Sequence, residues 1–157
     1  MLEKSFADVY TKFKMSLYTK IFHQGVPVQE SLSAIEVLCV EVIYAMGRPT
    51  INEFASFAQV SAPNAAYKIS NLIKKGYVKK VRNEMDKREY HLEVTDTYMK
   101  NYGATYDYID VVMKRIRERF SPEQVKELEQ ILDVIDTELM QEVDLSHPVA
   151  FKSAKEI

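Results

Sequence analysis

Two predicted helices joined by a turn of about three residues leave few possible folds for the middle of the chain. The stretch "TINE" (Thr50–Glu53) is a capping box, in which the Thr side chain accepts a free helix amide and the Glu side chain bonds back to the cap. The helix that it opens ends near Ala58, and Ser61 then caps a second helix that Gly76 ends. Helices joined so tightly cannot easily lie antiparallel, so we expect them to cross steeply as a helix-turn-helix.

The second helix of this pair has an inward and an outward face. Apolar residues at helical spacing predict the inward face, which comprises Ala66, Ile69, Leu72 and Ile73. The remaining positions are expected at the surface, and they are Ala62, Pro63, Asn64, Tyr67, Lys68 and Asn71. In the turn, Gln59 stands where helix-turn-helix motifs often have Gly, which enters left-handed backbone conformations freely.

A β-hairpin with a long charged loop is predicted directly after this helix. Tyr77–Val81 and Tyr90–Thr95 both alternate apolar with polar residues, as expected of two short strands. The loop between them, "RNEMDKRE" (82–89), exceeds the usual two to five residues, so its tip should project from the body. A helix-turn-helix followed by a projecting hairpin is a winged helix-turn-helix, which we assign to residues 33–95.

Long amphipathic helices flank this core on both sides. An apolar stripe from Leu2 to Ile21 predicts an N-terminal helix that "HQGVPVQ" ends, and the capping box "SAIE" opens a helix from Ala34 to about Met46. After Thr95 one continuous helix is predicted through Phe120. The stretch "SPEQ" then restarts the helix, which continues to about Glu142.

These flanking stripes are too long for the winged core to cover. Uncovered apolar surface on two long helical extensions predicts a symmetric homodimer, although a bundle within one monomer stays open as an alternative. We therefore divide the chain into a helical dimerisation region (1–32 and 96–145), the winged core (33–95) and a C-terminal tail (146–157). The predicted fold class is mainly α with a small β-hairpin wing.

Positive charge is concentrated in one part of a weakly acidic chain. The 157 residues carry a net charge of −2, but eight basic and three acidic side chains between Ser61 and Tyr90 give that segment +5. This pattern indicates local attraction for a polyanion, with a simple solvated surface as the alternative. A single cysteine and the lack of a long apolar run or secretory leader predict a cytoplasmic protein with no membrane contact.

The sequence predicts no enzyme and no cofactor. His23, His91 and His147 lie on separate segments without metal-ligand spacing, so no metal site is expected. Cys39 lies midway along a helix that should be largely buried, without a neighbouring base, and a structural thiol is favoured over a redox switch.

The stretch "SAPNAAYKISNLIKKGYVKKVRNEMDKREYHLEVTD" resembles the recognition helix, wing and following strand of MarR-family transcription regulators. The wing signature of that family is an Asp, one residue and an Arg before the second strand, and it stands here as "DKREYHLEVT". The segments "SNLIKKGYV" and "LSAIEVL" resemble the exit of the recognition helix and the start of the second helix. The resemblance implies a dimeric repressor or activator, often released by a small ligand, with the first and last two helices forming the dimer interface.

Each implied DNA contact has a physical basis in this chain. Arg88, with Lys87 beside it, would enter a minor groove where the negative potential is deepest, and Asp86 would orient the Arg88 guanidinium. The alternative is that Asp86 and Arg88 only brace the hairpin. On the recognition helix, the predicted DNA-binding residues are Ser61, Pro63, Asn64, Tyr67, Lys68 and Asn71, with Asn64 suited to adenine and Lys68 to guanine or phosphate. Because Tyr67 stands where many relatives have Arg, base specificity does not carry over.

An aromatic stripe predicts a weaker candidate site for a lipophilic or aromatic ligand. Its residues are Phe13, Met15, Tyr44, Tyr102 and Tyr106, although such stripes more often pack a core. Two functions therefore remain open from the sequence. The first is a homodimeric regulator of double-stranded DNA, and the second is a winged helix that only contacts an acidic protein partner.

Overall fold

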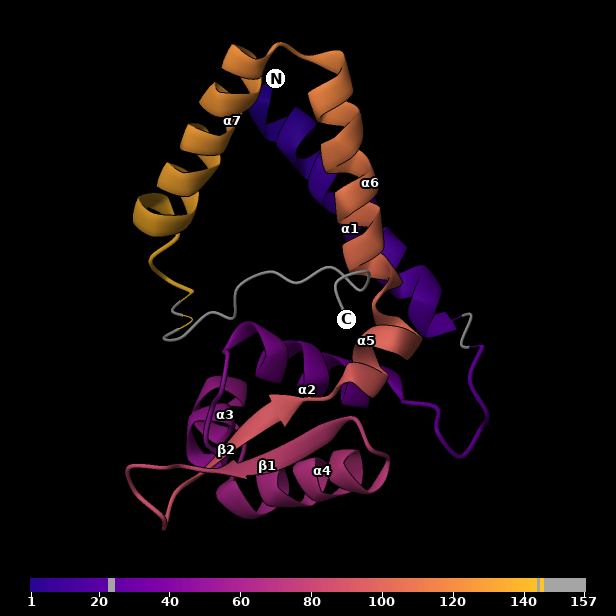
Figure 1. Ribbon diagram of the computed structural model, residues 1–157, viewed down its shortest axis with the longest axis vertical. Coiled ribbons are helices and arrows are strands. Elements are labelled where there is room, and N and C mark those ends of the chain that lie inside the picture. Colours follow the sequence, from indigo (N-terminus) through magenta and orange to yellow (C-terminus); the bar gives the residue numbers. More distant parts are fainter. Residues whose placement is uncertain (23–24, 144, 146–157) are drawn as a thin grey trace.

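The computed structural model describes residues 1–22, 25–143 and 145. Its helices are α1 (Leu2–Phe22), α2 (Ala34–Ala45), α3 (Ile51–Ala58), α4 (Ala62–Lys74), α5 (Asp96–Tyr102), α6 (Ala104–Arg119) and α7 (Pro122–Val134), and its strands are β1 (Val78–Arg82) and β2 (Tyr90–Val94). Figure 1 shows two parts: a winged core of α2 to α5 with the hairpin, and a long arm in which α1 runs beside α6 and α7 folds back. The predicted fold class is confirmed. The predicted tail, 146–157, lies outside the described residues.

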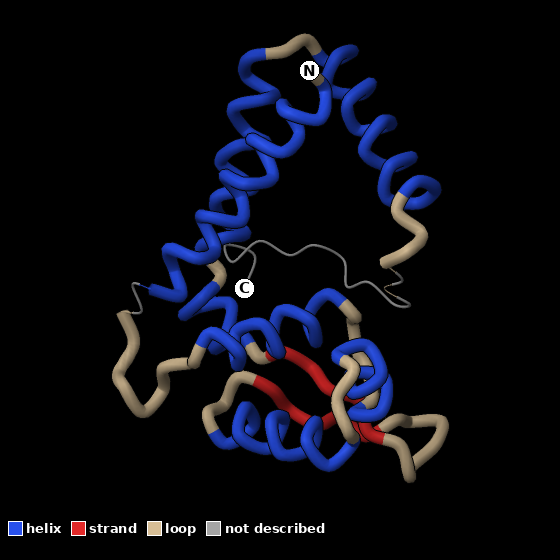
Figure 2. The backbone as a smooth tube through the Cα atoms, turned by 180° about the vertical axis from the view of Figure 1, so that it is seen from behind, coloured by secondary structure: helices blue, strands red, loops and turns tan. Residues whose placement is uncertain are grey.

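The winged core packs three helices against a two-stranded antiparallel sheet. The strands pair from Val78 opposite Val94 to Arg82 opposite Tyr90, and Val78 and Leu92 are buried in the core. On its other edge β2 bonds to the segment before α3, where the Leu92 amide donates to the Pro49 carbonyl at 2.8 Å. Figure 2 shows the hairpin between the helices, with its loop extending beyond them.

The starts of four helices, α2, α3, α4 and α7, were predicted correctly. Ser33, Thr50 and Ser121 each form the predicted capping box, and Ser61 caps α4 by accepting the Asn64 amide at 3.3 Å. Gly76, which follows the end of α4, has a φ of 83°. A left-handed backbone of this kind costs an L-residue about 1–2 kcal/mol, and glycine avoids that cost.

The prediction for the inward face of α4 was wrong at one residue. Ala65 is fully buried together with Ile69 and Leu72, whereas Ala66 is exposed and Ile73 is only half-buried. The buried residues follow a spacing of four and then three, which places Ala65 in their stripe and turns Ala66 away by about 100°.

A cluster of tyrosines connects the winged core to the arm. Tyr98 and Tyr102 of α5 stack with ring centroids 5.3 Å apart, and Tyr77 meets both rings edge-on. The Tyr102 hydroxyl accepts the Leu32 amide at 2.8 Å, and the Tyr77 hydroxyl donates to the Glu30 carbonyl at 2.6 Å. These bonds fix the segment that leads from α1 into α2, so the arm has a defined attachment to the core.

The long helix predicted from Tyr98 to Phe120 is interrupted. Gly103 ends α5, where its amide donates to the Met99 carbonyl at 2.8 Å, and its own carbonyl begins α6 by accepting the Tyr106 amide at 2.9 Å. The axis changes direction here, because α5 buries Tyr98, Met99 and Tyr102 in the core while α6 leaves beside α1 (Figure 1). The four-residue tyrosine spacing continues across the break, which is why the pattern did not reveal it.

The last helix is shorter than predicted. After α7 the backbone continues as one π-helical segment, Ile135–Leu139, and helical structure stops there, before Glu142. Neither α7 nor α1 contains a buried residue. Within the described part of the chain, no helix combines the length and apolarity needed to cross a membrane.

Candidate nucleic-acid interface

The turn between α3 and α4 keeps helix-turn-helix geometry without glycine. Gln59 adopts a left-handed conformation, with φ 52° and ψ 44°, and among the described residues it is the one non-glycine with positive φ. Its amide and that of Val60 both donate to the Ala55 carbonyl, at 3.0 Å for Val60. The turn therefore closes α3 with paired backbone bonds and directs α4 across it, although Gln59 carries the strain of a Cβ in that conformation.

The first turns of α4 form the exposed end of the winged core. Ser61, Pro63 and Asn64 are exposed, and Tyr67 keeps 69% of its surface accessible. Lys68 and Asn71 are half-buried on the same helix. Figures 1 and 2 place α4 at the end of the core away from the arm, so its outer face can approach a large partner.

The wing tip is ordered by a residue that the sequence analysis did not single out. The Asn83 side-chain oxygen accepts the Met85 amide at 2.9 Å, while its amide group donates to the Glu89 carboxylate at 2.8 Å. Its backbone amide also donates to the Glu89 carbonyl at 2.9 Å. An Asn at the start of a loop that bonds two residues ahead is an Asx-turn, and this signal could have identified it.

Asp86 shapes the wing mainly through the backbone. Its carboxylate accepts the Arg88 amide at 2.9 Å, and the same oxygen lies 3.5 Å from the Arg88 guanidinium Nε. The Arg88 side chain is 93% exposed, so the ion pair is weak and the guanidinium remains available. Lys87 is also exposed, and its carbonyl accepts a bond from Arg82 Nε at 2.6 Å. Asp86 therefore both braces the backbone of the loop and contacts the Arg88 guanidinium.

Polar contacts at the base of the wing hold the hairpin to the loop between α2 and α3. His91 Nδ1 lies 2.7 Å from the Arg48 carbonyl, and Arg48 Nε lies 2.8 Å from the Glu93 carboxylate. Lys79 reaches the same carboxylate at 3.1 Å. These contacts join segments far apart in sequence, so periodicity and motif spacing could not reveal them.

The predicted aromatic ligand site is only partly assembled. Tyr44 and Tyr106 pack with ring centroids 5.3 Å apart, and the Tyr106 hydroxyl donates to Glu41 at 2.7 Å. Phe13 instead meets Tyr108 edge-on at 5.7 Å, while Met15 is exposed and Tyr102 belongs to the core cluster. Burial, with the nearby Glu41 charge, raises the pKa of Tyr106 far above its usual range. These contacts favour packing over ligand binding.

Other candidate chemistry is not assembled either. Burial raises the pKa of the Cys39 thiol despite the nearby Lys68 ammonium, which favours the structural interpretation. His23 and His147 lie outside the described residues. In the described ranges, no group of three His, Cys, Asp or Glu side chains is placed to hold a metal ion.

The geometry just described agrees with a family match over the same segment. Residues 32–90 match the model of the MarR family. This segment therefore resembles a MarR-family domain. MarR-family proteins are DNA-binding transcription regulators and not enzymes, so the coarse functional prediction and the prediction of no enzyme are both confirmed.

Solved structures share the whole fold at low sequence identity. Streptococcus pneumoniae FabT, solved in complex with DNA, is 17% identical with a TM-score of 0.57, and the match covers 90% of this chain and 97% of FabT. A MepR mutant from a multidrug-resistant S. aureus clinical isolate is 16% identical with a TM-score of 0.60 over 89% of this chain and 98% of MepR. YusO of Bacillus subtilis is 15% identical with a TM-score of 0.50 over 87% and 93%. A comparison with curated proteins found no match.

Proposed function

We propose that this chain is a homodimeric repressor of the MarR family that reads a near-palindromic operator, with α4 in the major groove and the wing in the minor groove. The observation that carries the proposal is that the exposed start of α4 and the loop between β1 and β2 both belong to the winged core and lie away from the arm, and this loop carries the exposed Arg88 side chain. FabT, which shares the fold, was solved in complex with DNA. Residues 33–95 would then be the DNA-binding part.

The start of α4 suits contact with base edges and phosphate. The Asn64 side chain is exposed and can bond bidentately to adenine, while Lys68 and Asn71 extend the same face. Ser61 lies at the helix N-terminus, where backbone amides and the helix dipole favour a phosphate. Pro63 and Tyr67 add exposed apolar surface, which suits contact with a thymine methyl group or a sugar.

The wing suits a minor groove. Arg88 is almost fully exposed beside Lys87, and Asp86 and Asn83 fix the loop that presents both. A narrow minor groove concentrates negative potential, which attracts an inserted guanidinium. Because this contact depends on the shape and charge of the groove, it should strengthen binding to many DNA sequences. It should be strongest where A·T-rich DNA flanks the site.

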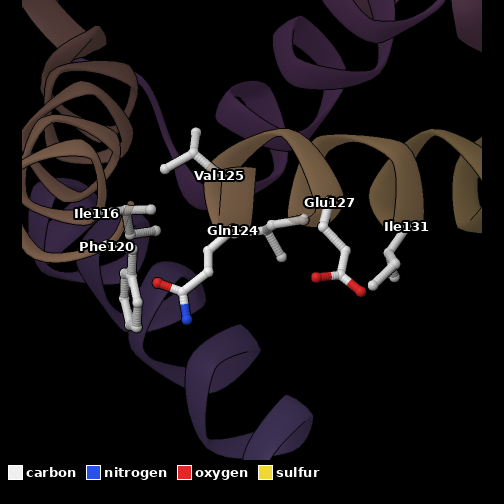
Figure 3. Close-up of a pocket in the computed structure, with 7 residues that line it drawn as sticks. Ile116, Phe120, Gln124, Val125, Glu127 and Ile131 are labelled. Carbon is white, nitrogen blue, oxygen red and sulfur yellow. The ribbon is translucent and has the colours of Figure 1, made fainter. Parts of the chain in front are cut away.

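The arm provides the surface that a second copy would cover. Large apolar side chains remain exposed on α1, including Phe6, Val9 and Tyr10, and on α7, including Ile131 and Leu132. Where α6 meets α7, a hollow of about 300 Å³ is lined mainly by apolar side chains. Figure 3 shows Ile116 and Phe120 on one side and α7 residues on the other. Such a surface is expected at an interface, so residues 1–32 and 96–145 are the proposed dimerisation region.

Selection of bound sequences from a random DNA pool tests the proposal most directly. A dimer with two recognition helices should enrich a near-palindrome whose half-sites lie about 10 base pairs apart. Sedimentation of the free chain should show a dimer, and binding to random duplexes should fall steeply with salt. A monomer, or salt-insensitive binding with no enriched sequence, would instead favour the protein-contact module.

A further inference from the structure

A histidine at the base of the wing has a hydrogen-bond partner at each ring nitrogen. His91 lies in β2, and its side chain is 22% exposed. Its Nδ1 lies 2.7 Å from the Arg48 carbonyl, in the loop between α2 and α3, and its Nε2 lies 3.2 Å from the Asn83 side-chain nitrogen. The ring therefore connects the body of the winged core to the residue that orders the wing tip.

These partners define which ring nitrogen carries the proton. A carbonyl only accepts hydrogen bonds, so Nδ1 must donate to Arg48. The Asn83 side chain has a fixed orientation, because its oxygen accepts the Met85 amide at 2.9 Å and its nitrogen donates to the Glu89 carboxylate at 2.8 Å. The same nitrogen is therefore a donor to His91, and Nε2 must accept. All of these bonds form together only when the ring is neutral and carries its proton on Nδ1.

Charged side chains of both signs lie around the ring. Residues two apart in a strand share a face, so Glu89 and Glu93 flank His91, and Lys79 pairs with Glu93 across the hairpin. Arg48 approaches from the loop between α2 and α3 and also pairs with Glu93, at 2.8 Å. The Glu89 carboxylate lies 3.5 Å from Nε2, so it is placed to receive that nitrogen once it is protonated.

A second proton on His91 would remove its bond to Asn83. Nε2 would then carry a hydrogen that faces the hydrogens of the Asn83 side-chain nitrogen, and two opposed donors repel each other. The imidazolium would instead attract Glu89 and draw this carboxylate away from Asn83 as well. Histidine is the side chain that ordinarily changes charge between about pH 5 and 8, which suits it to such a role.

We propose that His91 is a positioning residue for the wing: when neutral it holds Asn83 and the loop that presents Arg88, and when protonated it releases that loop and weakens DNA binding. The effect on DNA rests on the proposed function, whereas the effect on the loop does not. The direction of the effect is distinctive, because an added positive charge by itself would strengthen binding to DNA. Acidification is thus converted into a loss of affinity.

Nuclear magnetic resonance of the full chain tests the loop without DNA. At about pH 8 the nitrogen-15 shifts of the His91 ring should show the neutral form protonated on Nδ1, and His91→Gln identifies these signals among those of the three histidines. As the pH falls from about 8 to about 5.5, the backbone amides of Met85 and Arg88 should lose order in step with protonation of the ring. A neutral ring protonated on Nε2, or amides whose order does not follow the ring, would overturn the proposal.

Two variants change the bond between the ring and the loop in opposite ways. His91→Gln offers an oxygen to Asn83 and a nitrogen to the Arg48 carbonyl but does not titrate, so the loop should stay ordered throughout this pH range. Asn83→Asp replaces the donor by an acceptor, so its loop should instead be more ordered when His91 is protonated. If His91→Gln loses order on acidification as the wild type does, another group is responsible and the proposal fails.

Fluorescence anisotropy with the selected operator tests the effect on DNA. Between about pH 8 and 5.5 the wild type should lose about fivefold in affinity relative to His91→Gln, which corresponds to one hydrogen bond of ordinary strength. Because both proteins share their other titratable groups, the ratio isolates the ring. Equal pH profiles, or tighter binding by the wild type at low pH, would refute the positioning role while the proposed function stands. If the chain binds no DNA, the proposed function and the effect on DNA both fail, and the hold of His91 on the loop is still decided by resonance.

Discussion

Glu41 accepts hydrogen bonds from two tyrosines at the attachment of the arm, and its removal should destabilise the protein strongly. The Tyr98 hydroxyl donates to one carboxylate oxygen, and the Tyr106 hydroxyl donates to the other at 2.7 Å. The Tyr98 side chain is fully buried and Tyr106 is 9% exposed. Glu41→Ala therefore removes both of these hydrogen bonds, and the Tyr98 hydroxyl is out of reach of solvent.

The expected cost follows from the two hydrogen bonds to Glu41 that are lost. An unsatisfied buried polar group costs about 1–3 kcal/mol, and Tyr106 can recover part of its loss from water because it lies at the edge. We expect Glu41→Ala to lower the free energy of unfolding by about 2–4 kcal/mol. For a chain of this size that corresponds to a fall in Tm of roughly 5–15 °C. Urea and thermal unfolding followed by circular dichroism, at one fixed protein concentration because a dimer is proposed, would measure both.

A matched background isolates the role of the phenols. In the Tyr98→Phe/Tyr106→Phe variant the donors are absent, so Glu41→Ala should cost far less there than in the wild type. If the cost of Glu41→Ala is the same in both backgrounds within about 0.5 kcal/mol, the phenol bonds are not its cause and the reasoning is refuted.

Three further outcomes follow from the interface and the helix ends. Arg88→Ala should weaken binding to every DNA duplex and reduce the salt dependence of the affinity. Asn64→Ala should instead relax the preference at one base position. If both variants lose the same affinity on all sequences, Asn64 does not read a base. Gln59→Gly should raise the free energy of unfolding in urea by about 0.5–1 kcal/mol, because relief of the left-handed strain exceeds the added chain entropy, and a destabilised variant would contradict this. Burial alone raises the pKa of Glu36, but its bonds to Lys75 and Ser33 outweigh burial and hold that pKa below its usual value. The stability from Glu36 should therefore be complete near pH 7 and lost as pH falls through this lowered pKa, so the deficit of about 1 kcal/mol expected for Glu36→Gln at neutral pH should shrink as the solution is acidified.

Features encoded by short-range chemistry were predictable from the sequence. The three capping boxes and the Ser61 cap depend on residues within four positions of each other, and the wing follows from alternation around a charged loop. The buried face of α4 was predicted except at Ala65 and Ala66. Because both residues are alanine, the spacing of apolar residues cannot distinguish which of the two is buried.

Features that depend on tertiary packing were not predictable in this way. The break at Gly103 arises because α5 packs into the core while α6 packs against α1, and the spacing of apolar residues is the same on both sides. Glu41 and Arg48 bond to residues more than 40 positions away in the sequence. The DNA contacts themselves remain predictions.

The change of axis at Gly103 sets the angle between the winged core and the arm in the proposed dimer. Helix α6 extends about 24 Å from this point, so a rotation of roughly 10° there displaces its far end by about 4 Å. If the arms of two copies are held together, the same rotation would instead move both winged cores along the duplex. In such an assembly the spacing of the half-sites would depend on side-chain packing at this junction, well away from the residues proposed to contact bases.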